Sequence, residues 1–144
     1  MRWIYDDGGR AAAGCRGTAR DCVVRAVAIA TEQEYDYVYR LFAAGNASER
    51  RRGPGASKRT ARSGINTRSR WFKAYMHALG WRWTPTMGIG TGCRVHLTDG
   101  ELPMGRLIVA VSRHYAAVID GVIHDTHDPT RGGGRCVYGY WSHT

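Results

Sequence analysis

The sequence predicts an α+β domain in which N-terminal helices pack on a C-terminal antiparallel β-sheet. Two observations indicate this class. Apolar residues recur at helical spacing in three stretches, about 19–31, 35–44 and 71–79. Residues after about 105 instead form short runs of β-branched and small side chains separated by turn signals. Helices and strands that are segregated along the chain are typical of α+β proteins rather than of doubly wound parallel sheets.

Length and charge limit the organisation further. A chain of 144 residues suits one domain, since domains peak at about 100–150 residues, so we expect a single domain over 1–144 with a basic loop at about 46–70. The formal net charge is +9, and every basic residue except Lys58 and Lys73 is an arginine. This excess is typical both of a GC-rich genome and of a protein that contacts polyanions, so the charge alone does not choose a function.

The N-terminus and the cysteines favour a cytoplasmic protein. The stretch M-R-W-I-Y-D-D-G-G-R has acidic residues where a secretory signal needs an apolar run, and no later segment approaches the roughly 20 apolar residues of a membrane span. None of the four cysteines belongs to a C-x-x-C pair. In a reducing compartment we therefore expect free thiols rather than disulfides. The cysteines are Cys15, Cys22, Cys93 and Cys136.

The first predicted elements are a short strand and an apolar helix. Residues 2–5 suit an edge strand. Thr18-Ala-Arg-Asp21 has the form of a capping box, with an acidic residue in place of the usual Glu or Gln, and it predicts a helix over about 19–31. Cys22 would then lie in the first turn of this helix.

Two further helices and the remaining strands follow in order. A helix is expected over 35–44, with Gly45-Asn46 as its stop, and another over 71–79, with Gly80 at its C-terminus. Trp81 and Trp83 alternate with polar neighbours as on a strand. Residues 105–112 read as a buried strand and residues 136–141 as a last aromatic strand.

The segment 112–129 predicts a β-hairpin, because Asp120-Gly121 separates two strand-like runs. His114 begins the first strand, and Asp125 and Asp128 end the second. A two-residue type I′ turn pairs position 114 with 127 and puts Asp125 diagonally on the face of His114, whereas a three-residue loop with a bulged Gly121 favours Asp128. Either register brings a base and an orienting carboxylate together.

Cys22 is the best candidate nucleophile among the four cysteines. A thiol at a helix N-terminus feels the positive end of the helix dipole and the unpaired backbone amides, and both favour the thiolate. Arg16, Arg20 and Arg25 lie close in sequence and add positive potential. The same amides could stabilise an oxyanion.

The order of a helix-borne Cys, a strand His and an Asp-Pro pair resembles the papain-like thiol hydrolases, including the double-glycine bacteriocin-processing peptidases and the transglutaminase core. The motifs concerned are D-C-V-V-R-A-V-A-I-A-T, H-Y-A-A-V-I and T-H-D-P-T, within about 18–44 and 105–130. The first also resembles small phage and bacterial proteins of this kind. Residues 15–18 read C-R-G-T where papain-like enzymes often have an oxyanion-binding Gln.

The resemblance implies a papain-like core and a cysteine-dependent hydrolase or acyltransferase that acts on a peptide or isopeptide bond of a peptide or protein substrate. Cys22 would attack the carbonyl, His114 would transfer the proton, and an aspartate would hold the imidazole. The resemblance favours Asp128, while the simplest turn favours Asp125; we prefer Asp128. No cofactor is implied.

A zinc site is the alternative for the same segment. His124 and His127 form H-x-x-H, with Asp125 and Asp128 interleaved and Cys136 nearby. A spacing of three on a strand puts the two histidines on opposite faces, and neither paired C-x-x-C nor a helical H-E-x-x-H is present. We therefore expect no metal.

The basic segment favours a second class of function, a non-enzymatic module that binds nucleic acid, another polyanion or a host protein on a papain-like scaffold. No acidic residue occurs between Glu49 and Asp99, and Trp71, Phe72, Trp81 and Trp83 follow the basic run. An inhibitor built on an inactive protease fold is a third hypothesis. The candidate nucleic-acid-binding residues are Arg50, Arg51, Arg52, Lys58, Arg59, Arg62, Arg68 and Arg70.

Overall fold

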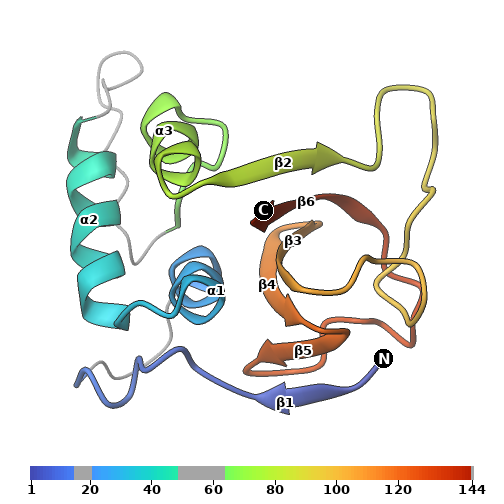
Figure 1. Ribbon diagram of the computed structural model, residues 1–144, viewed down its shortest axis with the longest axis horizontal. Helices are drawn as coiled ribbons and strands as arrows, with labels where there is room; N and C mark the ends of the chain where they lie inside the picture. Colours follow the sequence, from blue (N-terminus) through green and yellow to red (C-terminus); the bar gives the residue numbers. More distant parts are fainter. Residues whose placement is uncertain (15–20, 49–63, 144) are drawn as a thin grey trace.

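The structure, a computed structural model, describes residues 1–14, 21–48 and 64–143 (Figure 1). In these residues three helices and a six-stranded mixed sheet confirm the α+β class. None of the helices in the described part of the chain is long and apolar enough to cross a bilayer. The elements are β1 (Trp3–Tyr5), α1 (Cys22–Thr31), α2 (Tyr35–Ser48), α3 (Arg70–Ala78), β2 (Trp81–Pro85), β3 (Arg106–Val111), β4 (His114–Ile119), β5 (Val122–Asp125) and β6 (Val137–His143).

The sheet is mixed rather than purely antiparallel, which corrects the expectation from the sequence. Its strand order is β1-β5-β4-β3-β6-β2, and β1 runs parallel to β5 with Trp3 opposite Ile123. The other neighbouring strands pair antiparallel. β1 reaches the sheet from the far N-terminus, not through a hairpin, so no tight turn forces it to run antiparallel. It is an edge strand, as predicted.

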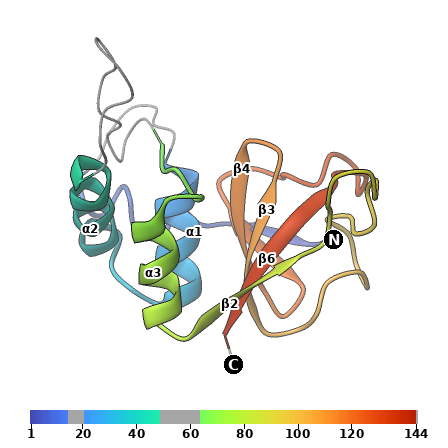
Figure 2. The same ribbon diagram turned by 90° about the horizontal axis from the view of Figure 1, so that it is seen from above.

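The helices and the sheet share one core. Views from two directions place the helices on one side of the molecule and the strands on the other (Figures 1 and 2). Val27 of α1, Phe42 of α2 and Phe72 of α3 are fully buried in a cluster with Ile108 of β3. Leu107, next to Ile108, belongs instead to a second cluster. Successive residues of β3 therefore fill two cores, as expected of a central strand that is buried on both faces.

Two helix boundaries differ from the sequence-based expectation. The helix α1 begins at Cys22, with Asp21 as its N-cap residue, rather than at residue 19. The helix α2 continues through Gly45 to Ser48, so the pair Gly45-Asn46 is not a stop. A Cβ at position 45 would lie 2.7 Å from Cε2 of Trp71 and closer still to two other ring atoms. Gly45 is thus needed inside the helix because the indole ring packs directly on its backbone.

The β4–β5 hairpin has a two-residue turn, the first of the two geometries considered from the sequence. Asp120 and Gly121 both adopt left-handed conformations, with φ of 48° and 78°. Ile119 pairs with Val122 directly across this turn. Positive φ at both central residues is characteristic of a type I′ turn, and this turn sets the register of the whole hairpin.

A disulfide between Cys93 and Cys136 corrects the expectation of free thiols for these two residues. A bridge between His96 and Cys136 draws the β2–β3 connection against the start of β6, and the Cα atoms of the two cysteines are 5.8 Å apart. That separation suits a disulfide. The two cysteines are 43 residues apart in the sequence, and this spacing does not by itself indicate a disulfide. Cys22 is a free thiol, and Cys15 lies outside the described residues.

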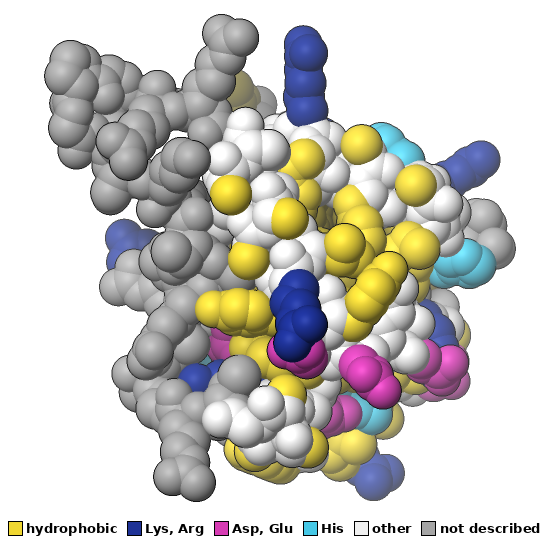
Figure 3. Space-filling model, turned by 90° about the vertical axis from the view of Figure 1, so that its left-hand side faces the viewer, with side chains coloured by type: hydrophobic (Ala, Val, Ile, Leu, Met, Phe, Trp, Pro, Cys, Tyr) yellow, Lys and Arg dark blue, Asp and Glu magenta, His cyan; other side chains and the backbone are white. Residues whose placement is uncertain are grey.

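The outer face of the helical side carries both hydrophobic and charged side chains. Tyr37 and Leu41 of α2 are exposed. Figure 3, which faces this side, shows hydrophobic side chains among basic and acidic ones. We assign no function to this face.

Candidate active site

Cys22 is the first residue of α1 and is partly buried. The preceding Asp21 makes no capping hydrogen bond, because its buried carboxylate is bound elsewhere. It accepts a hydrogen bond from the Tyr35 hydroxyl at 2.7 Å and forms ion pairs with Arg10 and Arg25. The Asp21 side chain therefore leaves the first amides of the helix, including that of Cys22, free to meet a negative charge.

His114 is the first residue of β4 and follows a turn in which Arg113 has a φ of 57°. The side chain of His114 is only 9% exposed. Its Nε2 lies 2.5 Å from Oδ2 of Asp125, so Nδ1 is the ring nitrogen left for the Cys22 thiol, with which the ring also interacts. The imidazole of His114 therefore interacts with the thiol of Cys22 through one nitrogen and with the carboxylate of Asp125 through the other.

Asp125 holds the imidazole, and Asp128 does not. The carboxylate of Asp125 is buried, and its Oδ1 accepts a hydrogen bond of 2.7 Å from the Thr126 amide. Asp128 is exposed, and its carboxylate accepts a hydrogen bond of 2.9 Å from the Thr130 amide. The preference for Asp128 was therefore wrong. The two-residue turn fixes the register that places Asp125, the alternative, beside His114.

The interactions of the three side chains favour a charged thiol and a charged ring. Burial alone would raise the pKa of the Cys22 thiol, but the hydrogen bond and charge of His114, the Tyr115 amide and the charge of Arg25 outweigh burial and lower it. Burial alone would lower the pKa of His114, yet Asp125 and Cys22 raise it to about 9. A thiolate–imidazolium pair is the form that these opposing effects favour near neutral pH.

Asp125 remains ionised beside the ring. Burial would raise the pKa of this carboxyl, but the hydrogen bond and charge of His114 and the Thr126 amide lower it overall. Nη2 of Arg25 lies 3.7 Å from Oδ1 of Asp125, and Nδ1 of His127 lies 4.0 Å from the same oxygen. The site thus includes a second carboxylate–cation contact through Arg25, which also pairs with Asp21.

Sequence reasoning missed two of these neighbours as site residues. Arg25 was considered only for its charge, although its position four residues after Asp21 on a helix allowed the ion pair to be anticipated. His127 was considered only as a zinc ligand, although the type I′ register pairs position 127 with position 114. The ring centroids of His114 and His127 are 5.0 Å apart.

The geometry favours hydrogen bonding over metal binding at these residues. Ligand atoms of His114, Asp125 and His127 lie within 4.8 Å of one another. The 2.5 Å between His114 and Asp125 suits a hydrogen bond, whereas two ligands about 2.1 Å from one tetrahedral zinc lie well over 3 Å apart. The zinc set considered from the sequence is not brought together, because His124 contacts Asp6 and Cys136 is bonded to Cys93.

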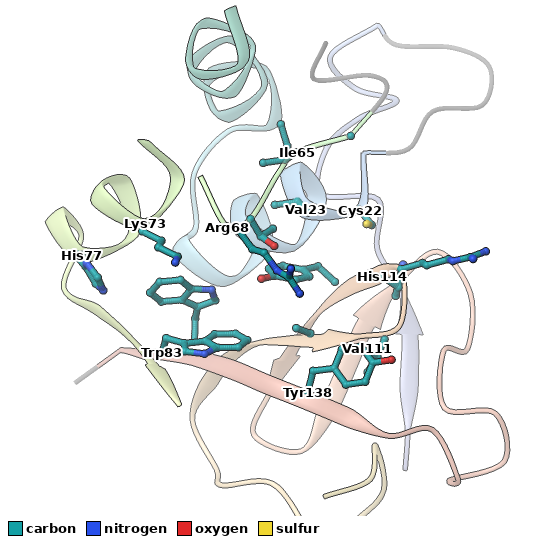
Figure 4. A pocket seen from close by; sticks show the side chains of 16 residues that line it. Cys22, Val23, Ile65, Arg68, Lys73, His77, Trp83, Val111, His114 and Tyr138 are labelled. Atoms are coloured by element: carbon teal, nitrogen blue, oxygen red, sulfur yellow. The ribbon is translucent and has the colours of Figure 1, made fainter. Parts of the chain in front are cut away.

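A cavity of about 760 Å³ opens beside the thiol and the imidazole. In Figure 4 the side chains of Cys22 and His114 lie at one end of this cavity, those of Lys73 and Trp83 lie at the other, and Arg68 lies between them. The volume is within the range of about 300–1,000 Å³ that is usual for ligand sites. The Cys22 thiol therefore borders a space large enough for part of a ligand.

Only two residues of the predicted nucleic-acid-binding set are described. Arg68 lines the cavity, and Arg70 is the first residue of α3. The residues 15–18, considered for the oxyanion hole, also lie outside the described part of the chain. The same holds for the rest of the basic set, namely Arg50, Arg51, Arg52, Lys58, Arg59 and Arg62.

Comparison of the chain with protein-family models, curated proteins and solved structures finds no significant match.

Proposed function

We propose that this protein is a cysteine-dependent hydrolase or acyltransferase of papain-like type that acts on a peptide or isopeptide bond. Cys22 is the nucleophile, His114 the general acid and base, and Asp125 the residue that orients the imidazole. The observation that carries the proposal is the bond of 2.5 Å between His114 and buried Asp125, on a ring that also interacts with the free thiol of Cys22. A base that is held by a carboxylate and interacts with a thiol supports the role of Cys22 as an activated nucleophile.

The proposed reaction proceeds through an acyl-enzyme. The thiolate of Cys22 attacks the carbonyl carbon, and the amides of the first turn of α1 stabilise the oxyanion. The imidazolium of His114 gives its proton to the leaving amine as the C–N bond breaks, which leaves a thioester. A water molecule, or the amine of an acceptor, then loses a proton to the neutral imidazole and attacks this thioester. The products are an acid or a new amide and the regenerated thiol.

Thiol labelling tests the nucleophile. Native protein is treated with a limiting amount of iodoacetamide at neutral pH, and peptide mapping compares Cys22 with Cys15, which serves as the internal control. We expect Cys22 to be alkylated first, because its pKa is lowered. The variant His114→Gln should slow alkylation of Cys22 without changing Cys15.

A matched variant and a second readout complete the test. His96→Gln removes a more exposed histidine whose ring contacts Glu101, and it should leave the alkylation of Cys22 unchanged. A peptide thioester should add an acyl mass to Cys22 in the wild type. The proposal would be contradicted if Cys22 and Cys15 were labelled equally, if His114→Gln did not change this labelling, and if no acyl adduct formed on Cys22.

A further inference from the structure

The cavity beside Cys22 has basic walls. Arg68, Lys73 and Arg113 line it, and no aspartate or glutamate is among the lining residues that the structure describes. None of the three cations forms an ion pair with a carboxylate that the structure describes. The carboxylate of Asp125, which contacts the cavity residue His114, is bound by His114 and Arg25. The cavity therefore offers uncompensated positive charge to whatever enters it.

The remainder of the cavity is mostly aromatic and apolar. Trp83 and Trp141 pack against each other with ring centroids 5.5 Å apart, and Tyr115 and Tyr138 also line the space. The buried Nε1 of Trp141 makes no hydrogen bond of good geometry among the described residues, and the Tyr115 hydroxyl is its polar neighbour. A substrate group that fits here must combine an apolar stem with an acceptor or a negative charge at its end.

We propose that the substrate is an acidic peptide segment, with a glutamate or aspartate side chain next to the scissile bond that enters this cavity and pairs with Arg68 and Lys73. This inference rests on the proposed function and specifies its substrate class. A glutamate side chain has the required form, because its methylene groups can lie on the tryptophan rings while its carboxylate reaches the cations. In Figure 4 the side chain of Arg68 lies between Cys22 and Lys73, so the paired carboxylate would remain close to the reacting thiol.

Cleavage-site profiling tests the substrate class first. A peptide library derived from a digested proteome is incubated with the wild type, and mass spectrometry reads the cleaved bonds. We expect Glu and Asp to be enriched at one position within about three residues of the bond. The best peptide is then prepared with Glu or Gln at that position, and kcat/KM should be about tenfold higher for Glu, as expected of two charge pairs at a solvent-open wall.

Charge-matched variants assign the preference to the cavity. Arg68→Gln combined with Lys73→Gln should abolish the difference in kcat/KM between the Glu and Gln peptides. Arg82→Gln removes an exposed cation of β2 that does not line the cavity, and it should preserve the preference. Cleavage without any charge preference, or an equal loss of preference in Arg82→Gln, would overturn the inference while the proposed function stands.

A binding measurement separates failure of the substrate class from failure of the chemistry. Cys22→Ala is titrated with fluorescein-labelled hexapeptides in which Ala alternates with Glu, Gln or Lys, and fluorescence polarisation should rank them Glu, then Gln, then Lys. This ranking, lost in the Arg68 and Lys73 double variant, would support the inference even if no bond were cleaved. A single-stranded oligonucleotide is the competing ligand. If it binds more tightly than the Glu peptide, displaces that peptide and depends on Arg68 and Lys73, the inference of an acidic peptide substrate is overturned in favour of nucleic acid.

Discussion

Replacement of Asp125 by alanine should lower the pKa of His114, and Asp128→Ala provides the matched control. The pKa of His114 is about 9 against an ordinary 6.5, a difference worth about 3 kcal/mol. Asp125 acts through a hydrogen bond and through its charge, and each of these effects is larger than the corresponding one from Cys22. Asp125 is therefore the stronger of the two partners that raise this pKa against the effect of burial. Its loss should therefore lower the pKa by at least about one unit.

The raised pKa of His114 determines how stability and activity depend on pH. A ring whose pKa is raised in the folded state contributes stability that is complete below pH 6.5 and is lost as the pH rises through about 9. The activity should likewise decline as the imidazolium loses its proton near pH 9. In Asp125→Ala this alkaline limit should move to about pH 8 or below.

Side-chain nuclear magnetic resonance measures the change directly. The His114 resonances are assigned by their loss in His114→Gln, and their titration is followed in the wild type, Asp125→Ala and Asp128→Ala. Asp125→Asn should restore part of the shift, because the amide oxygen can still accept a hydrogen bond from the ring. A wild-type His114 that titrates near 6.5, or equal changes in both aspartate variants, would refute the reasoning.

Two other predictions concern stability. A Cβ at Gly139 would lie 2.8 Å from the Thr84 carbonyl oxygen and closer still to two ring atoms of Trp83, so Gly139→Ala should destabilise the fold by about 1–3 kcal/mol in urea unfolding. Gly134→Ala, whose nearest neighbour would be 3.8 Å away, is the control, and an equal effect of both changes would contradict the packing argument. The Cys93–Cys136 disulfide closes a sequence separation of 43 residues, and its reduction should cost about 4 kcal/mol by chain entropy. Thermal unfolding with and without dithiothreitol measures this cost, with Cys93→Ala as the variant that should not respond; an unchanged transition in the wild type would rule the cross-link out.

Some features of the site follow from local sequence because local physics decides them. Asp120-Gly121 can adopt two positive φ angles at low cost, so the turn type, the register and the choice between Asp125 and Asp128 were all implied by two residues. The family resemblance favours Asp128, but this local geometry places Asp125 beside His114. The apolar spacing after Cys22 similarly indicated α1, although not its first residue.

Other features required the tertiary structure because they depend on contacts between distant segments. From the sequence Gly45 is expected to end a helix, whereas in the structure it lies inside α2 because the Trp71 ring packs on it. The Cys93–Cys136 pairing depends on how the β2–β3 connection meets β6. By itself the sequence determined a helix-borne thiol and a hairpin that joins an imidazole to a carboxylate. Only the tertiary structure decided that α1 meets β4 at Cys22 and His114, and that uncompensated cations line the cavity beside them, because burial and charge compensation are properties of the packed chain.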